Sequence, residues 1–512
     1  MDDFAFSQPS IYQVLYDNLD EQGRLPRDFS LMGALQDQSG SQSFFFSDGF
    51  MEANVTGSDK GEEACPELIA VVEQILAGNY GEAVRNLKAY FAPEEEHLMN
   101  QVVLPLQHWI YDHRDTVDPE RLIWFSGHLI LEADQVELVK FALTLLEFYD
   151  LSEDEEFPDM LHLLAQCNEF TLFCLRDFSV WDTALEEIFR TAQNVYGWGR
   201  IFALEVLEPR TAPIRQWMLE EGWDNDVNPE YTALVIAQSV DLPGVVKRAA
   251  LSDKAFRGAG HIIDALLQDE PAPGISEIRN PAALLKDYLA HAKTMARTIE
   301  DYTIVLHILQ YVESHIEGEV QTTLKNQCGD ILMSFACAQA VQEALEQGKG
   351  FDLARALELP YAEAAEKCLR QAPLDRISLL PYALTRDEAH NREIIHIYEQ
   401  ALPLGTLLGG DWDEMPVEQQ LSKEYLDLNG VISQLYGYPG VGRNLILAAL
   451  GSPASMNRNT ALEVLQQWQN LGYPLTEALH HQLEHLCLRE KDQDILEKAH
   501  HLLGGHGSGG LQ

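Results

Sequence analysis

The stretch VELVKFALTLLEFY, residues 136–149, places apolar side chains at every third or fourth position. This spacing is the period of an amphipathic α-helix, and it recurs in CPELIAVVEQILA at 65–77 and DPERLIWFSGHLI at 118–130. The helical runs end at glycine, proline or Asn/Asp clusters, and no run alternates polar and apolar residues over the length of a strand. The sequence therefore predicts an all-α chain.

Short helices continue in this way from residue 65 to residue 503. A closed bundle does not accommodate so many short helices, whereas stacked helical hairpins do. HEAT-like and armadillo-like hairpins take roughly 40–47 residues each, so this body has room for about ten. The sequence predicts a HEAT/armadillo-like α-solenoid whose halves, 65–266 and 285–503, are joined by a hinge at 267–284, LQDEPAPGISEIRNPAAL.

The two ends of the chain differ from this body. Residues 1–64 are rich in Ser, Gly, Asp and Gln, and they contain Phe44, Phe45, Phe46 and Phe50. Polar, glycine-punctuated sequence rarely orders by itself, so we expect a partly extended segment that lies over the body and is anchored by its aromatic side chains. Residues 504–512, GGHGSGGLQ, are expected to form a flexible tail.

The charge of the chain limits its expected partners. Lys and Arg number 35 against 81 Asp and Glu, which gives a formal net charge of −46. A charge of this size and sign repels nucleic acid and anionic membranes, so neither is an expected partner. We interpret the acidic residues mainly as a solvated surface, and a patch that binds a basic protein or peptide partner is the alternative.

The cysteines and the first residues indicate a compartment. The seven cysteines occur singly, without a CxxC pair, and most lie in apolar helical runs, as in FTLFCLRDF at 170–178. The N-terminus, MDDFAFSQPSIYQ, has neither a basic region nor an apolar core of the kind found in secretory signals. We therefore expect a cytoplasmic protein with free thiols.

The stretch YGWGRIFALEVLEPRTAPIRQWMLEEG, residues 196–222, predicts two short helices that meet at a Glu208–Pro209 turn. GWDNDVN follows at 222–228, and exposed tryptophan beside carboxylates suits the capture of a cationic or peptide ligand. The alternative is that the tryptophans fill the core at the helix corners. The candidate binding residues are those that the helices do not need for packing: Trp198, Arg200, Arg215, Trp223, Asp224, Asn225, Asp226 and Asn228.

The frame R-x-x-A-L-E-V-L occurs twice, at 200–207 and at 458–465. Its small alanine lets a neighbouring helix approach closely, and its leucines fill the seam. An arginine in the first turn is unfavourably placed in the helix dipole, so we expect each arginine to bond a group outside its own helix. Asn457, Arg458 and Asn459 form a second candidate binding site.

Known catalytic patterns are incomplete in this sequence. Gly197-x-Gly199 lacks the third glycine of a dinucleotide loop, and GYPGVGRN at 437–444 lacks the Lys-Ser/Thr pair of a P-loop. Three Glu-x-x-His pairs are about the number that chance provides, and we interpret them as surface residues: Glu94–His97, Glu393–His396 and Glu477–His480. The residues predict no metal, no cofactor and no catalytic group.

Several segments carry a resemblance that spans nearly the whole chain: IYQVLYDNL and GRLPRDFSL near the N-terminus, HLILEADQVELVKFALTLLE, GWGRIFALEVLEP, IRQWMLEEGWDN, IHIYEQALPL and NRNTALEVLQQW. Together they resemble a family of bacterial proteins commonly labelled "limonene hydroxylase". The resemblance implies the oxidation of a monoterpene, and of its alcohols, with an NAD(P) cofactor. The shared motifs are signatures of hydrophobic helices, and no catalytic residue carries over from them.

Two hypotheses follow from these observations. The favoured one is a non-enzymatic cytoplasmic scaffold of helical repeats that binds a protein or peptide along its concave face. The alternative, implied by the resemblance, is a monoterpene hydroxylase with an associated alcohol dehydrogenase activity.

Overall fold

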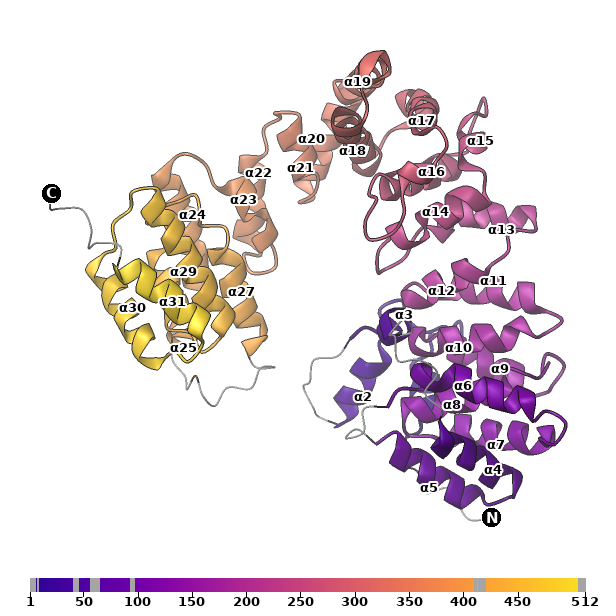
Figure 1. Cartoon of the computed structure of the whole chain (residues 1–512). Coiled ribbons are helices and arrows are strands. Elements are labelled where there is room, and N and C mark those ends of the chain that lie inside the picture. The colour runs from indigo at the N-terminus through magenta and orange to yellow at the C-terminus, as the bar shows by residue number, and fades with distance from the viewer. Residues whose placement is uncertain are drawn as a thin grey trace. The chain divides into compact units, whose positions relative to one another are not determined.

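The computed structural model describes residues 6, 9–39, 46–55, 65–92, 97–408, 412 and 420–504. Every regular element in these ranges is a helix, so the prediction of an all-α chain is confirmed for them (Figure 1). The chain forms two compact units. Unit 1 comprises Met1–Met295 and His307–Gln327, and unit 2 comprises Ala296–Leu306 and Cys328–Gln512.

The body of unit 1 is a succession of helices that pack mainly against helices one or two places away in the chain. For example, α8 contacts α6, α7 and α10, and α14 contacts α12, α15 and α16. The helices are α4 (Pro66–Leu76), α5 (Tyr80–Tyr90), α6 (Met99–Asp112), α7 (Pro119–Glu132), α8 (Val136–Leu146), α9 (Phe157–Ala165), α10 (Asn168–Ser179), α11 (Ala184–Asn194), α12 (Trp198–Val206), α13 (Ala212–Trp217), η1 (Met218–Gly222), α14 (Glu230–Ser239), α15 (Leu242–Val246), α16 (Asp253–Leu266), η2 (Ile275–Glu277) and α17 (Pro281–Met295).

Helix α8 lies at the centre of this packing. Every residue from Leu138 to Leu146 is buried, because the helix is apolar on nearly all sides and neighbouring helices cover it. Each fully buried leucine or phenylalanine stabilises the fold by about 1.5–3 kcal/mol relative to an exposed one. The stretch that predicts the helical fold is therefore also the core of unit 1.

The described part of the N-terminal segment contains three helices, α1 (Ile11–Asp17), α2 (Leu31–Ser39) and α3 (Phe50–Val55). Helix α1 packs on α7 and α9, and α3 packs on α6 and α10. The Phe50 ring stacks on Phe46 at 4.6 Å and meets the Trp198 ring edge-on at 6.1 Å, as expected for an aromatic anchor. Phe44 and Phe45 lie outside the described residues.

A buried ion cluster joins the N-terminal segment to the body. Lys140 of α8 is 2% exposed, and its Nζ lies 2.6 Å from Glu52 of α3, 2.6 Å from Glu169 of α10 and 3.0 Å from Glu137 of α8. Burial alone would lower the pKa of Lys140, but the three carboxylates raise it. Burial also raises the pKa of Glu52, and Lys140 offsets this only in part. One ammonium group therefore compensates the charge of three carboxylates, and without it their burial would be strongly unfavourable.

The predicted hinge at 267–284 lies inside unit 1. It contains η2 and the first residues of α17, and Asp269 accepts hydrogen bonds from the backbone of Gly274 and Ser276. The division between the units instead falls within α18 (Ile299–His315) and α19 (Gly318–Leu332), which contribute residues to both.

Unit 2 repeats the pattern of neighbouring helices in contact, for example α29 with α27, α28 and α31. Its largest buried side chain is Trp468, whose Nε1 donates to the Leu435 carbonyl at 2.8 Å. The helices are α20 (Phe335–Glu346), α21 (Phe351–Ala356), α22 (Ala362–Gln371), η3 (Ile377–Leu379), α23 (Leu380–Ala383), α24 (Glu388–Ala401), α25 (Leu404–Leu407), α27 (Lys423–Ile432), α28 (Arg443–Leu450), α29 (Ser455–Asn470), α30 (Glu477–Arg489) and α31 (Gln493–Gly504). Apart from Gly504, the predicted tail lies outside the described residues.

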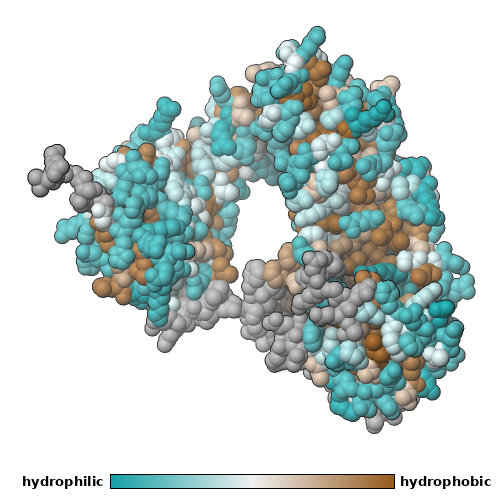
Figure 2. Space-filling view, viewed as in Figure 1, coloured by the Kyte–Doolittle hydropathy of each residue, from teal (hydrophilic) through white to brown (hydrophobic). Residues whose placement is uncertain are grey.

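Hydrophilic side chains cover most of the visible face of both units, as the net charge of −46 leads one to expect (Figure 2). Hydrophobic side chains gather on the visible surface of unit 1 around α12 and α14. The candidate site lies among the same elements.

Candidate functional site

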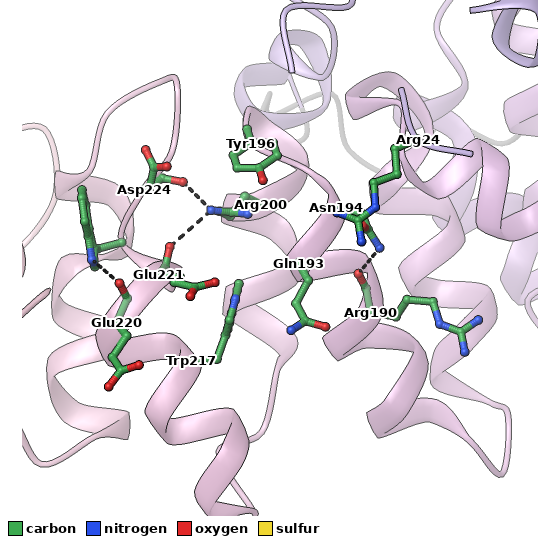
Figure 3. A pocket seen from close by; sticks show the side chains of 11 residues that line it. Arg24, Arg190, Gln193, Asn194, Tyr196, Arg200, Trp217, Glu220, Glu221 and Asp224 are labelled. Carbon is green, nitrogen blue, oxygen red and sulfur yellow. Dashed lines mark hydrogen bonds between the residues drawn. The ribbon is translucent and has the colours of Figure 1, made fainter. Parts of the chain in front are cut away.

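A cleft of about 610 Å³ opens in unit 1 where the end of α11, the start of α12 and the turn after η1 meet (Figure 3). Arg24 of the N-terminal segment completes its wall. The lining residues are Arg24, Arg190, Gln193, Asn194, Tyr196, Arg200, Trp217, Glu220, Glu221, Trp223 and Asp224. The stretch 196–222 and the turn that follows it thus provide most of the cleft.

The local fold of this stretch follows from its capping residues and glycines. The Thr211 hydroxyl accepts from the Ile214 N–H and caps α13, and the chain continues from α13 into the wider turn η1. At position 199 a Cβ atom would lie 2.5 Å from Thr171 Oγ1. Gly199 is therefore needed for the close approach of α12 to α10, and the GWGR corner is explained by packing.

Arg200 lies at the centre of the cleft, beneath the Tyr196 ring (Figure 3). The residue is 3% exposed, and its Nη1 donates to the Asp224 carbonyl at 2.6 Å and to the Glu221 carbonyl at 3.3 Å. Its guanidinium lies 4.2 Å from the Tyr196 ring centroid and 5.5 Å from that of Trp217. Burial lowers the pKa of Arg200, which Tyr196 and Asp224 offset in part.

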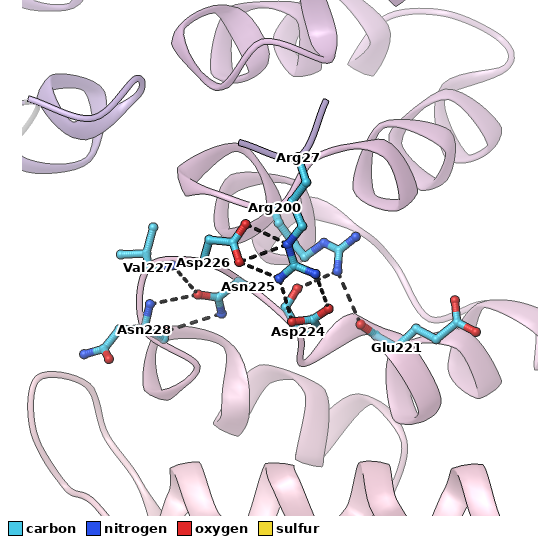
Figure 4. A network of polar contacts seen from close by, with 8 residues as sticks. All are labelled: Arg27, Arg200, Glu221, Asp224, Asn225, Asp226, Val227 and Asn228. Atoms are coloured by element: carbon cyan, nitrogen blue, oxygen red, sulfur yellow. Dashed lines mark hydrogen bonds and ion pairs between the residues drawn. The ribbon is translucent and has the colours of Figure 1, made fainter. Parts of the chain in front are cut away.

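The side chains of Asp224 and Asp226 are held by an arginine of the same chain (Figure 4). Arg27 donates to both Asp224 oxygens at 2.8 Å, and its Nε donates to the Asp226 oxygens at 3.0 and 2.9 Å. Its guanidinium also lies 4.4 Å from the Tyr196 ring centroid. The hydrogen bonds from Arg27 lower the pKa of Asp224 and keep it ionised. We name this arrangement, Arg27 with Asp224 and Asp226, the arginine clamp.

The two asparagines of the candidate set shape the turn that carries the clamp. Asn225 Oδ1 accepts from the backbone N–H of Asn228 at 2.8 Å and of Val227 at 3.1 Å. The Asp226 N–H donates to the Tyr196 carbonyl at 2.6 Å, which ties the turn to the start of α12. The Asn225 side chain, bonded to the backbone of Val227 and Asn228, thus shapes the turn that carries Asp224 and Asp226, and Asn228 contributes through its backbone.

The remaining candidates in this region differ from the expectation of exposed tryptophan. Trp198 is 7% exposed and packs on Phe50 and Tyr231, so its ring fills the core. Trp223 is half-buried and stacks on His261 at 3.8 Å. Arg215 is exposed and donates to the Pro209 carbonyl at 2.6 Å, outside the cleft that Arg200 occupies.

The second candidate site is largely internal. Asn457 is fully buried, and Arg458 is 5% exposed and donates to Glu490 at 2.6 Å and to the carbonyls of Ser452 and Pro453 at 2.8 and 2.7 Å. Asn459 contacts Glu463 and Lys498 at the surface. The expectation that both arginines of the repeated frame bond groups outside their own helices is confirmed, but Asn457 and Arg458 are not open to a partner.

A buried acidic pair lies elsewhere in unit 1, in α10 and at the end of α8. Glu147 is 8% exposed and lies 3.8 Å from Arg176, and burial raises its pKa to about 7. Asp177 is 1% exposed, its oxygens have no hydrogen-bond partner among the described residues, and burial raises its pKa well above the usual range. These groups make unit 1 sensitive to pH.

In the described part of the chain, no group of three or more His, Cys, Asp or Glu side chains is arranged to hold a metal ion. His396 contacts Glu399 and His480 contacts Glu484, both at the surface. The described helices also include none with the length and apolar character needed to cross a membrane.

Comparison with known proteins does not assign the chain to a family. A scan against protein-family models, a search of curated proteins and a search of solved structures each gave no match. The function must therefore be argued from the cleft and the clamp.

Among the residues of this site that the sequence did not single out are two basic ones, Arg24 and Arg27. They belong to GRLPRDF, a polar segment about two hundred positions before the acids that Arg27 binds. Single arginines in an acidic chain indicate a binding site only weakly, because one sequence does not show which carboxylates lie near them in the fold.

Proposed function

We propose that the chain is a cytoplasmic α-solenoid scaffold of HEAT/armadillo type that binds an extended, basic segment of a partner protein at Asp224 and Asp226. Helices that pack on near neighbours in the chain support the repeat architecture. Six of the seven free cysteines are buried and the seventh is partly buried, which suits a reducing compartment.

The arginine clamp is the observation that carries this proposal. In the clamp, Asp224 and Asp226 hold Arg27 by bidentate, charge-assisted hydrogen bonds. Arg27 belongs to a segment without regular structure, residues 24–30. A partner segment with a similarly placed arginine meets the same acceptors. The side chains of the clamp are 38–44% exposed, so a partner reaches them from solvent.

The chain's own segment competes for this site. A tethered segment acts at an effective concentration of about millimolar, so a free partner displaces it only when Arg27 is weakened or the partner binds more tightly. Wild-type protein is therefore expected to bind free peptide weakly.

The test uses a fluorescently labelled peptide that copies residues 20–32, DEQGRLPRDFSLM, with full-length variants. Its anisotropy should report binding about tenfold tighter to Arg27→Ala than to wild type, since the acceptors are then free. Adding Asp224→Asn and Asp226→Asn to Arg27→Ala should abolish the gain, whereas the exposed control Asp182→Asn should not. Equal affinity for all variants would refute the proposal.

The oxidoreductase alternative has its own test. Hydroxylation of limonene with O2 and NAD(P)H, or oxidation of carveol with NAD(P)+, by the purified protein would support it and would count against a purely binding function.

A further inference from the structure

The two arginines of the repeated frame have similar surroundings with one difference. Arg200 and Arg458 are both nearly buried, and each donates through Nη1 to two backbone carbonyls. Each also lies 4.2 Å from an aromatic ring centroid, Tyr196 and Trp412 respectively. Arg458 has a carboxylate partner, Glu490, whose side chain is 3% exposed. Arg200 makes no ion pair with any described residue, and its buried Nε has no acceptor there.

Buried guanidinium groups are normally paired with a carboxylate or another anion. The acids that line the cleft do not fill this role for Arg200. Asp224 is bound by Arg27 at 2.8 Å, Glu221 pairs with Lys254 at 3.1 Å, and Glu220 accepts from Gln216 at 3.3 Å. Arg200 is therefore a buried cation on the floor of an open cleft, and none of the described carboxylates bonds its guanidinium. The charge of Asp224 offsets only in part the lowering of the Arg200 pKa by burial.

The side of the cleft next to Arg200 supplies further donors. Figure 3 shows Arg24 and Asn194 to the right of Arg200, with Trp217, Gln193 and Arg190 below. Arg24 is exposed, and its side chain makes no interaction with the described residues. Three guanidinium groups, two amides and three aromatic residues thus line one volume of about 610 Å³, which Glu220, Glu221 and Asp224 also border.

We propose that this cleft is a carboxylate-binding site. A carboxylate of the ligand pairs with Arg200 there, in the way that the Glu490 carboxylate pairs with Arg458. The ligand is a carboxylate of the partner segment, either an acidic side chain or its C-terminus. This assignment rests on the proposed function, because it adds a second contact of the same partner beside the clamp. A small free carboxylate shares this chemistry, and the test distinguishes the two sources.

The experiment follows the fluorescence of the tryptophans in the cleft, at constant ionic strength, in full-length protein. One arm titrates sodium glutarate. The other titrates ten-residue peptides that carry one glutamate, each matched by the same peptide with glutamine. The variants are Arg24→Gln, which removes an exposed group without a partner, Arg200→Lys, which keeps the charge but loses the forked geometry, and the exposed control Arg215→Gln.

Glutamate peptides should bind about 10- to 100-fold more tightly than their glutamine partners, and Arg24→Gln and Arg200→Lys should each remove most of that difference. The melting temperature of Arg24→Gln should equal that of wild type, which separates lost binding from lost folding. Glutarate binding as tightly as the best peptide would confirm the carboxylate site but overturn its assignment to a partner protein. If Arg24→Gln and Arg215→Gln bind both glutarate and the peptides equally well, the carboxylate site is refuted. The anisotropy test of peptide binding at the clamp remains an independent test of the proposed function.

Discussion

Replacing Lys140 with methionine removes the one ammonium that Glu52, Glu137 and Glu169 share. Methionine has a similar length and packs well in an apolar interior, so the main effect is electrostatic. Because the three carboxylates stay in place around a side chain that is 2% exposed, they lose their counterion without regaining water. Breaking a buried ion pair by removing one partner costs about 3–5 kcal/mol.

For a unit of about 300 residues, that loss corresponds to a decrease of about 5–8 °C in the melting temperature of unit 1. The measurement is differential scanning calorimetry at pH 7.5, with two controls. Lys254→Met removes a side chain that is 69% exposed and should change the stability by less than about 1 kcal/mol. Adding Glu52→Gln and Glu169→Gln to Lys140→Met should restore part of the loss, because fewer charges then remain buried.

Two results would contradict this reasoning. A Lys140→Met protein that melts within about 1 kcal/mol of wild type would mean that the carboxylates are solvated or protonated at no cost. If adding the glutamine substitutions lowered the stability further, packing rather than charge would explain how the cluster stabilises unit 1.

Three further predictions test other contacts. Burial raises the folded-state pKa of Glu147 to about 7, so the folded state binds a proton more tightly than the unfolded chain does. The free energy of unfolding should therefore fall as the pH rises from 5 to 7. In urea titrations, Glu147→Gln should remove on the order of 2–3 kcal/mol of this fall, whereas the exposed control Glu186→Gln should retain the full fall. Gly199→Ala places a methyl group 2.5 Å from Thr171 Oγ1 and should cost about 1–3 kcal/mol in thermal melts; an unchanged melt would show that α10 and α12 separate freely. Arg458→Gln leaves Glu490 buried without its cation and should lower the free energy of unfolding of unit 2 by about 3–5 kcal/mol. Calorimetry should show a shift in the unfolding transition of unit 2 and no shift in that of unit 1. A shift in both transitions would refute the expectation that the two units unfold separately.

The sequence predicts local features of this protein better than long-range ones. Apolar periodicity locates the helices, and Thr211 and Pro213 mark the start of α13, because these signals act within a few residues. The repeated frame also predicts that Arg200 and Arg458 bond outside their helices, since the helix dipole disfavours them where they stand.

The site itself depends on contacts that one sequence does not state. Trp198 has the residue type and neighbours that suit a ligand, yet Phe50, nearly 150 positions earlier, packs against it. Asp224 and Asp226 read as free acids until Arg27 is placed beside them. Burial of a tryptophan and pairing of a carboxylate are tertiary properties, so they follow from packing and not from local pattern.

The arginine clamp also sets an order of events during synthesis. Arg27 leaves the ribosome 197 positions before Asp224, its first acceptor. At about 5–20 residues per second, the earlier segment waits roughly 10–40 s for its binding surface. During that interval its basic groups are available to chaperones or to other nascent chains, so closing the clamp is a late step in the maturation of unit 1.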